Sequence, residues 1–307
     1  MNAVPAKSLM EEVALEMGIM PAFVEKDWYV VQVLVLISGL NLAGASVVFT
    51  GGTALAKAHR LLKRFSEDID FRLIDPALAA LSTSRQRKRL SGIRESIYTV
   101  LSAAFPAGGV KWKSRNSNQF FLFELDYPSV FDRATALRPH VQIEFTVASM
   151  LLAPIACQVG SFVTELTGEN PELPTITCVD PAENAVDKLS ALVWRIPDRV
   201  RQPEDNDPDL VRHIHDLAIL RPHALCQADF KRLAIETIGR DDDRCKRITG
   251  WPLEKKLDLM IGILESDKGY QPEYDRFVGG MSYATAGVPS FNEAMESLKA
   301  LNSHLLS

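Results

Sequence analysis

The sequence predicts an α+β fold, in which a mixed sheet with helices comes first and a helical bundle follows. In the first half of the 307 residues, short apolar runs alternate with helical patterns. One run, His140 to Val147, has apolar residues at every second position, which is the period of a half-buried strand. After a proline-containing segment, Asn170 to Pro181, long helical patterns follow one another. We therefore expect two domains, residues 1–175 and 176–307.

The composition is that of a folded globular protein. Hydrophobic residues make up 47% and charged residues 24% of the chain, so disorder, collagen and coiled coil are excluded as overall classes. The formal net charge of −5 argues against a protein coated in basic residues. It does not exclude a local basic surface that binds nucleic acid.

The start of the chain favours a cytoplasmic protein. Three acidic residues stand where a signal peptide needs its apolar region: Glu11, Glu12 and Glu16. No charged residue lies between Trp28 and Ala56, which is long enough for a membrane span, but polar residues and glycines divide this stretch. We expect no membrane span there, but a helix from Pro21 to Ser38, a turn over Gly39 to Gly44, and a buried strand from Ala45 to Thr50.

The cysteines carry no recognisable metal-binding spacing. Cys157, Cys178, Cys226 and Cys245 lie at least 19 residues apart, whereas structural zinc sites use short paired spacings. We expect them to be reduced and mostly packing residues.

A Gly-Gly pair follows the first strand. Gly51 and Gly52 precede Thr53 and a run of good helix formers, TALAKAHRLL, before a second apolar run from Ile69 to Ile74. Without side chains, such a turn lets backbone N–H groups approach a phosphate, and the helix dipole favours the negative charge. An ordinary tight turn is the alternative.

Two carboxylates stand at alternate positions where the second strand begins. Asp68 and Asp70 therefore point to one face of that strand and can bind a divalent cation such as Mg²⁺. A chance pair on a solvated strand is the alternative, but the nearby Gly-Gly turn adds an anion cradle, and the two together suit a nucleoside triphosphate with its metal. Ser66, expected on the same strand face, could hydrogen-bond a phosphate oxygen or simply cap the strand.

The remaining elements complete the expected fold. A helix is expected from Arg85 to Phe105 and a strand from Phe120 to Leu125. The expected helices of the second half are Ala182 to Trp194, Asp209 to Leu220, Ala228 to Ile238, Leu253 to Glu265 and Phe291 to Leu301.

The block FTGGTALAKAHRLLKRFSEDIDF resembles the signature of the polymerase-β-type nucleotidyltransferase superfamily, in which Gly-Gly or Gly-Ser precedes Asp-apolar-Asp. Glu144 in VQIEFTV best matches the third acidic residue of that signature, although a solvent-facing glutamate is the alternative. More narrowly, the chain is similar to the AbiEii/AbiGii and MenT-type toxins. This resemblance includes EKDWYVVQVL, PAENAVDKLSALVWR and VRHIHDLAIL and covers most of the chain.

The resemblance implies a polymerase-β-like core and a toxin with a cognate antitoxin. It also implies an enzyme that uses two Mg²⁺ ions to transfer a nucleotide from an NTP to RNA, in this family to the tRNA 3′ end, which inhibits translation. The family's essential lysine and aspartate map onto Lys188 and Asp216, where His215 stands in place of the usual arginine and Arg212 could substitute.

The residues around these positions allow the same roles. A lysine is a point charge suited to a triphosphate, and Asp216 lies among apolar residues, where it could orient Lys188 or Arg212. A solvated helix lysine and a structural ion pair are the alternatives.

A basic segment points to a nucleic-acid acceptor. Eight basic residues and one acidic residue lie between Arg85 and Arg115. Such a segment attracts phosphate backbones, and Trp112 and Phe120 could stack on unpaired bases. A solvated face is the alternative. The candidate RNA-binding residues are Arg85, Arg87, Lys88, Arg89, Lys111, Lys113 and Arg115.

Two other functions stay open at this point. The same metal site would serve a nucleotidyltransferase whose acceptor is a small molecule or a protein. A non-catalytic module that only binds a nucleotide would tolerate loss of Asp68.

Overall fold

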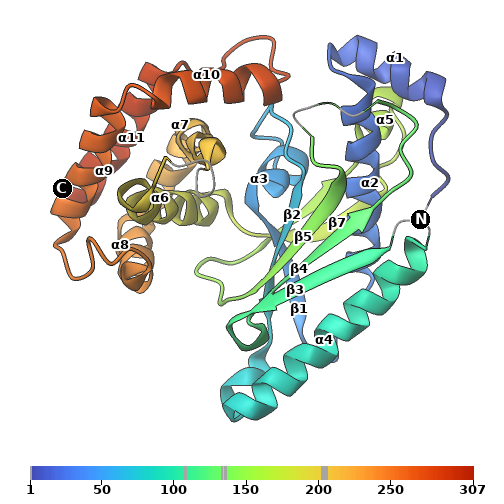
Figure 1. The fold of residues 1–307 in the computed structure, drawn as a ribbon, viewed down its shortest axis with the longest axis horizontal. Helices are drawn as coiled ribbons and strands as arrows, with labels where there is room; N and C mark the ends of the chain where they lie inside the picture. The colour runs from blue at the N-terminus through green and yellow to red at the C-terminus, as the bar shows by residue number, and fades with distance from the viewer. Residues whose placement is uncertain (1, 107–108, 133, 135–136, 202–206) are drawn as a thin grey trace. The chain divides into compact units, whose positions relative to one another are not determined.

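A computed structural model describes residues 2–106, 109–132, 134, 137–201 and 207–307 (Figure 1). It divides into two compact units. Unit 1 comprises Met1–Arg60 and Phe65–Val179, and unit 2 comprises Leu61–Arg64 and Asp180–Ser307. The short segment Leu61–Arg64 thus belongs to unit 2, although it lies between two strands of unit 1 in the chain.

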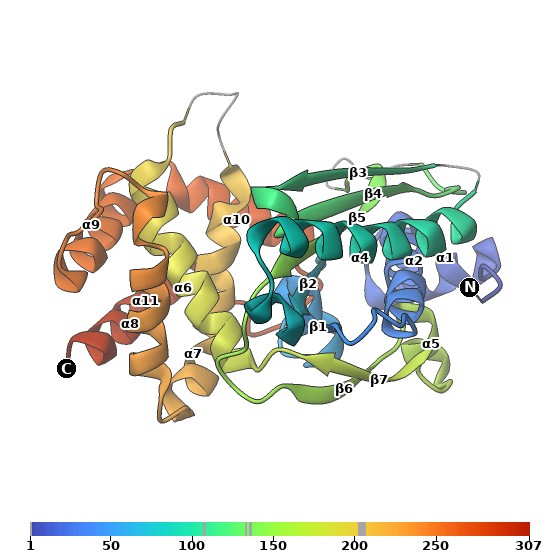
Figure 2. The ribbon, with the colours of Figure 1, turned by 90° about the horizontal axis from the view of Figure 1, so that it is seen from below.

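Unit 1 is built on a mixed sheet of seven strands in the order β3-β4-β5-β2-β1-β7-β6 (Figures 1 and 2). β2 is parallel to β5, and β1 is parallel to β7, while the other neighbouring pairs are antiparallel. The strands are β1 (Ser46–Thr50), β2 (Asp68–Ile74), β3 (Val110–Arg115), β4 (Phe120–Asp126), β5 (His140–Val147), β6 (Ile155–Val159) and β7 (Leu173–Cys178).

The helices of unit 1 precede the first strand or lie between strands in the chain. They are α1 (Lys7–Met17), α2 (Pro21–Ser38), α3 (Gly51–Thr53), the π-helical turn η1 (Ala54–Ala58), the 3₁₀ turns η2 (Pro76–Ala80) and η3 (Asn116–Asn118), α4 (Thr83–Ala104) and α5 (Phe162–Thr167). The prediction of the helix Pro21–Ser38 and of the strand His140–Val147 is confirmed at both ends. No pattern had indicated α1, α5, β3, β6 or β7.

A row of four phenylalanines crosses the sheet and fixes its register. Phe49 of β1 pairs with Phe71 of β2, Phe71 pairs with Phe145 of β5, and Phe145 pairs with Phe121 of β4. The Phe71 and Phe145 rings stack with centroids 5.2 Å apart, and the Phe145 and Phe121 rings are 5.1 Å apart. All four rings are buried. Because successive side chains alternate between faces, the residue next to each phenylalanine points to the opposite face.

Helices α2 and α4 cover the aromatic face (Figure 2). Their apolar residues, including Leu34 of α2 and Ile97 of α4, form one buried cluster with the phenylalanines. Burial against the sheet explains why α2 can be so apolar, since a helix that is hydrophobic all round is buried. Among the described helices, none is long and apolar enough to cross a membrane.

Three consecutive charged residues of α2 are buried, and each holds a different part of unit 1. Glu25 accepts hydrogen bonds from the Val130 backbone N–H at 2.8 Å and from the Ser129 hydroxyl at 2.5 Å. Lys26 pairs with Glu67, and Asp27 pairs with Lys57 at 3.0 Å. Buried charges need such partners, so the charged end of α2 connects three separate segments to the core.

Unit 2 is helical, as the sequence predicts. Its main helices are α6 (Pro181–Asp198), α7 (Arg212–Cys226), α8 (Phe230–Arg240), α9 (Leu253–Ser266), α10 (Tyr270–Met281) and α11 (Phe291–Leu306), with the 3₁₀ turns η4 (Pro208–Val211) and η5 (Asp242–Arg244). α10 had not been expected, because Pro272, Gly279 and Gly280 lower its helix propensity. Packing overrides this, since Tyr270, Tyr274 and Phe277 recur along one buried face.

Two expectations around the Gly-Gly turn were wrong. The helix ends at Ala58, shorter than the run TALAKAHRLL suggested, and Arg60 takes a left-handed backbone conformation with φ 56°. The following residues leave unit 1 and join unit 2. Ser66 is not on the strand face of Asp68, because β2 begins only at Asp68 and Phe65 packs edge-on against Phe23 of α2.

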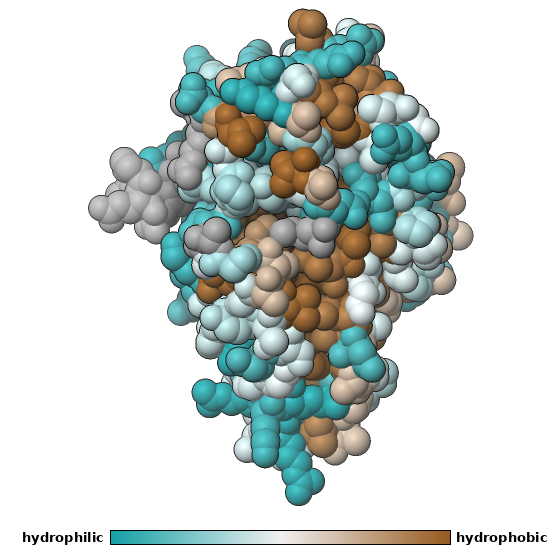
Figure 3. Space-filling model, turned by 90° about the vertical axis from the view of Figure 1, so that its right-hand side faces the viewer, coloured by the Kyte–Doolittle hydropathy of each residue, from teal (hydrophilic) through white to brown (hydrophobic). Residues whose placement is uncertain are grey.

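Hydrophobic residues gather in the middle of the face that Figure 3 shows, with hydrophilic side chains above and below. Among the described residues of unit 1, seven large hydrophobic side chains are exposed: Val4, Leu15, Met20, Trp112, Val130, Ile155 and Leu166. Exposed apolar side chains are ordinary on protein surfaces, so they do not by themselves indicate a binding site.

Candidate active site

Three carboxylates share the face of the sheet that lies opposite the phenylalanine row. Asp70 pairs with Glu144 across the parallel strands β2 and β5, one position before Phe71 and Phe145. Asp68 stands two residues before Asp70 and therefore points to the same face. All three side chains are half-buried. The register that the aromatic core imposes thus brings together the acidic residues that the sequence singled out.

Gly51 meets this carboxylate group directly. Its φ is +78°, a left-handed backbone conformation that residues other than glycine rarely adopt. A Cβ added at Gly51 would lie 2.1 Å from Oδ2 of Asp70, so the Asp70 carboxylate occupies the space that a side chain would need. Gly51 is therefore required both for the turn and for the close approach of Asp70.

Neighbouring polar groups position two of the three carboxylate residues. The buried Thr53 hydroxyl donates to the backbone carbonyl of Asp68 and so holds the strand end, while the expected role of Thr53 in nucleotide binding stays a prediction. Gln142 lies opposite Asp68 on β5, and its Nε2 donates to Oε1 of Glu144 at 2.7 Å.

A cation that the sequence had not indicated lies against Asp68. The Arg138 guanidinium forms an ion pair with the Asp68 carboxylate, and the Arg138 backbone N–H donates to Glu67 at 2.9 Å. The Arg138 carbonyl accepts a hydrogen bond from Lys26 at 2.9 Å. Burial lowers the pKa of Lys26, although Glu67 acts in the opposite direction. The carboxylate face thus already attracts a positive charge.

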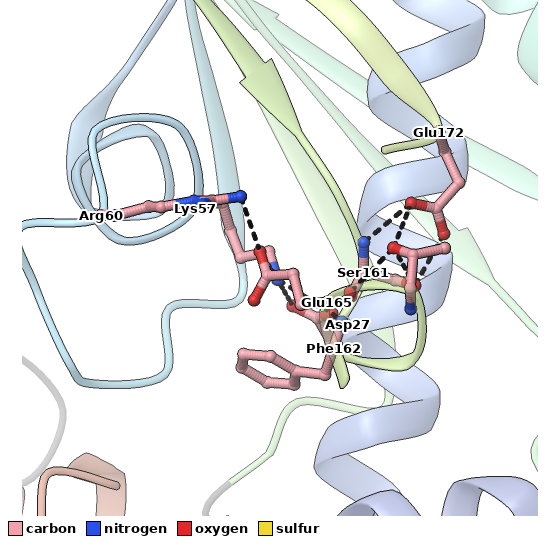
Figure 4. A network of polar contacts seen from close by, with 8 residues as sticks. Asp27, Lys57, Arg60, Ser161, Phe162, Glu165 and Glu172 are labelled. Carbon is pink, nitrogen blue, oxygen red and sulfur yellow. Dashed lines mark hydrogen bonds and ion pairs between the residues drawn. The ribbon is translucent and has the colours of Figure 1, made fainter. Parts of the chain in front are cut away.

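A buried ion pair holds the helical turn that follows Gly51 (Figure 4). Lys57 contacts Asp27 at 3.0 Å and Glu165 at 3.6 Å, and its ammonium lies 4.0 Å from the centre of the Phe162 ring. Asp27 also accepts a hydrogen bond from the Phe162 N–H at 2.6 Å, at the start of α5. Burial raises the pKa of Asp27 to about 6, despite the opposing effect of Lys57.

Lys188 and Asp216 come together within unit 2. Asp216 is completely buried and accepts from Lys188 at 2.8 Å. Arg64 binds the same carboxylate through two nitrogens, at 2.8 and 2.7 Å. The arginine that pairs with Asp216 is thus Arg64, and not Arg212 as the sequence suggested. His215 Nδ1 lies 3.1 Å from Oδ1 of Asp216.

The pKa shifts in this cluster follow from its burial and its charges. Burial alone would raise the pKa of Asp216, but Arg64 and Lys188 hold it well below its usual range. Burial lowers the pKa of Lys188 more than the Asp216 carboxylate raises it. These contacts hold the charged groups of Asp216 and Lys188 side by side in the buried cluster.

The basic segment lies on α4 and β3, and acidic neighbours already pair with some of its positive charges. Arg85, Arg87 and Lys88 are exposed on α4. Arg89 is not available in the same way, because it pairs with Asp75 and donates to the Ala43 carbonyl at 3.0 Å.

On β3 the exposed basic residues are Lys111, Lys113 and Arg115. Lys113 contacts Glu124 at 3.1 Å, and Lys111 contacts Asp126 at 3.8 Å. Trp112 packs against Arg94, whose guanidinium carbon lies 3.8 Å from the ring centre. The β3 part is therefore less positive than the sequence count indicated.

The carboxylate face fits a magnesium ion by its chemistry. Carboxylate oxygens are the ligands that this ion prefers, and in phosphate chemistry it keeps positions for water and substrate. Asp68, Asp70 and Glu144 supply such oxygens on one face, and the Arg138 guanidinium beside Asp68 shows that a cation is stabilised there.

Comparison with known proteins identifies the family. The family described as nucleotidyl transferase AbiEii toxin, type IV toxin–antitoxin system, matches residues 36–297. The chain belongs to the AbiEii family. It is therefore a nucleotidyltransferase toxin of a type IV toxin–antitoxin system, and a cognate antitoxin is implied.

The fold is similar to that of a solved nucleotidyltransferase toxin. The nucleotidyltransferase toxin MenT4 from Mycobacterium tuberculosis H37Rv is 18% identical, with a TM-score of 0.64, and the match covers 99% of this chain and 90% of that one. A weaker likeness links the chain to an H. pylori protein described as a nucleotidyltransferase, at 14% identity and a TM-score of 0.38, covering 90% and 94% of the two chains. A comparison with curated proteins gives no match.

Proposed function

We propose that this AbiEii toxin transfers a nucleoside monophosphate from an NTP to the 3′ end of an RNA, with tRNA as the acceptor, and thereby inhibits translation. The observation that carries the proposal is the alignment of Asp68, Asp70 and Glu144 on one sheet face against the bare backbone of Gly51. A tRNA acceptor would place the reaction in the cytoplasm.

In the proposed reaction, an acceptor hydroxyl attacks the α-phosphate of the NTP, and pyrophosphate leaves. Asp68 and Asp70 would hold two Mg²⁺ ions, and Glu144 would help to hold the ion on the acceptor side. When bound, these ions lower the pKa of the attacking hydroxyl and neutralise charge on the phosphates. Gly51 lets Asp70 approach the Gly-Gly turn that would contact the triphosphate, and Thr53 keeps the strand end in place.

Lys188, Asp216 and Ser66 have more limited assignments. We propose, from the family resemblance, that Lys188 is essential and neutralises phosphate charge, and that Asp216 holds it in place. The proposal that Ser66 contacts the nucleotide rests on the sequence alone, since the residue is half-buried and precedes the strand.

The acceptor is proposed from the exposed basic residues. Arg85, Arg87 and Lys88 form a solvent-exposed group on α4 that suits a phosphate backbone. Lys111, Lys113 and Arg115 extend this group along β3, although acidic residues of β4 reduce their charge.

The transfer reaction is tested with purified protein, Mg²⁺, total tRNA and each α-labelled NTP in turn. Label should appear on RNA with one nucleotide. Asp68→Asn and Glu144→Gln should reduce the rate by about 10³-fold or more, because each metal ligand contributes several kcal/mol to transition-state stabilisation. Glu12→Gln, an exposed glutamate on α1, is the matched control and should leave the rate unchanged.

The labelled product decides between the candidate acceptors. Label on a protein or a small molecule would refute the RNA acceptor but keep the transferase. Replacing Arg87 and Lys88 by glutamine should weaken RNA binding. It should also make the dependence of the binding constant on salt concentration less steep, by about the amount that two phosphate contacts contribute. Lys255→Gln, an exposed position in unit 2, should change neither quantity. Equal effects of both changes would reject α4 as the RNA-binding surface.

A further inference from the structure

Three metal-ligating side chains from distant parts of the sequence meet on unit 1, apart from the carboxylate face. His59 follows the turn η1, Cys157 lies on β6, and Cys178 ends β7. Their ligand atoms all lie within 4.8 Å of one another. We propose that His59, Cys157 and Cys178 bind one Zn²⁺ ion, at a site separate from that of the proposed catalytic metal.

The separations between donor atoms suit a tetrahedral ion. At zinc bond lengths, an imidazole nitrogen and a thiolate lie about 3.6 Å apart, and two thiolates about 3.8 Å apart. His59 Nδ1 lies 3.8 Å from Cys157 Sγ. The site needs only small side-chain shifts to close around the ion.

The histidine ring is oriented as in known metal sites. His59 Nε2 lies 2.9 Å from the Val179 carbonyl oxygen. A carbonyl only accepts, so Nε2 carries the proton, and the neutral ring presents the lone pair of Nδ1 toward the thiol of Cys157. Histidines that bind metals usually donate their other N–H to a carbonyl or carboxylate in this way. The hydrogen bond thus sets the tautomer that a zinc ligand requires.

The strand register favours a shared ion over a disulfide. Cys157 pairs with Ile176 and Cys178 pairs with Ile155, so the two cysteines are diagonal neighbours on one face of the β6–β7 pair. Diagonal neighbours have Cα atoms about 7–8 Å apart, beyond the usual 4.4–6.8 Å of a disulfide. Both cysteines are free thiols in this structure.

The burial of the ligands leaves a way in for the ion. Cys178 is fully buried, whereas His59 and Cys157 are half-buried. Three protein ligands leave the fourth position to water. The bound ion would connect the end of the segment that begins at Gly51 to the antiparallel pair of strands β6 and β7.

The test uses reduced, metal-free full-length protein with excess Mg²⁺ to occupy the carboxylates. Titration with Co²⁺ should give a thiolate-to-cobalt charge-transfer band that saturates at one ion per chain. The thiols should release their protons as Co²⁺ binds. One equivalent of Zn²⁺ should then displace the Co²⁺ and remove the band. Asp68→Asn should leave the band unchanged, which separates this site from the catalytic one.

Half-buried positions provide the decisive variants, because they are the least disruptive to folding. Cys157→Ser and His59→Gln should each weaken Zn²⁺ binding by more than the roughly 10–100-fold that loss of an outer-shell partner costs. Cys226→Ser, at an exposed thiol of α7, is the control and should bind Zn²⁺ like the wild type. Absence of the band in wild-type protein, its persistence in Cys157→Ser, or loss of two thiols to a disulfide without metal binding would each overturn the proposal.

Discussion

Replacing Asp216 by asparagine tests whether the buried cluster of unit 2 depends on its single carboxylate. The substitution keeps the shape but removes the negative charge that Arg64 and Lys188 share. At 2.7–2.8 Å and an effective dielectric constant of about 20, each attraction is about 6 kcal/mol. Taking the ions out of water offsets much of this, and breaking one buried pair costs about 3–5 kcal/mol in practice. We expect Asp216→Asn to lower the free energy of unfolding by that amount.

Urea unfolding at pH 7, followed by circular dichroism and fluorescence, measures the change. The matched control is Asp207→Asn, which removes the partner of Arg195 at a partly exposed position of the same unit. That loss should stay below about 1 kcal/mol. Adding Lys188→Met to Asp216→Asn should recover part of the stability, because one uncompensated cation is removed. If Asp216→Asn costs no more than the control, the assigned ion pairs do not stabilise the fold.

The pH dependence gives an independent check on the same carboxylate. Because Arg64 and Lys188 hold the pKa of Asp216 well below its usual range, its contribution is present above about pH 4, the ordinary pKa of an aspartate. It is lost as the pH falls through the lowered value. The stability difference between wild type and Asp216→Asn should therefore be constant from pH 8 to pH 5 and shrink only in stronger acid. A difference that disappears near pH 6 would contradict the assignment.

Two substitutions test the carboxylate face itself. Gly51→Ala places a side chain at φ +78° and against Asp70, so it should destabilise the protein by about 2–4 kcal/mol in thermal or urea unfolding. The control Gly92→Ala, at an open position in α4, should be neutral or stabilising by up to about 1 kcal/mol, and similar losses for both would refute the close approach. Arg138→Ala removes the cation beside Asp68 and should tighten Mn²⁺ binding up to about five-fold, the limit for a partly exposed pair, whereas Arg85→Ala should not. Weaker Mn²⁺ binding by Arg138→Ala would show that Arg138 supports the site and does not compete with the metal.

The sequence predicted β1, β2, β4 and β5 well, but it did not predict β7 or the two edge strands, and for the edge strands the reason is physical. β5 has one buried face, so its residues alternate between apolar and polar, and the pattern gives both ends. β3 and β6 are the edge strands, and few of their side chains are buried. With few buried side chains, buried and exposed residues do not alternate regularly along these strands. The charged residues of β3 were therefore interpreted as part of a basic surface.

The same limit separates the site residues that could be predicted from those that could not. Gly51, Asp68 and Asp70 belong to one short stretch, where the types and spacing of residues carry the chemistry. Arg138 and Arg64 have no such local signal, because the fold brings them to their carboxylates from elsewhere in the chain. The charged residues within the apolar helix α2 could have indicated buried ion pairs, since charges in such a helix must have partners.

Cysteine spacing could not indicate the proposed zinc site, for a related reason. A spacing rule detects ligands that sit on one local turn, and it found none among the four cysteines. His59, Cys157 and Cys178 come from a helix end and from two strands that are adjacent in the sheet but separated in the sequence. Such a ligand set has no characteristic spacing, and only the register of β6 and β7 reveals it.

The segment from Gly51 to His59 shows why these distant contacts matter for the active site. Three residues of α3 and five of a π-helical turn are too few to form a stable helix alone. The segment is held at three points instead: Thr53 donates to Asp68, Lys57 pairs with Asp27, and His59 contacts the Val179 carbonyl. In the proposed site Gly51 must stay against Asp70, and these side chains supply the support that a preorganised site requires. A zinc ion at His59 would strengthen the last of the three points, which is why its effect belongs to the fold of the site and not to the transfer chemistry.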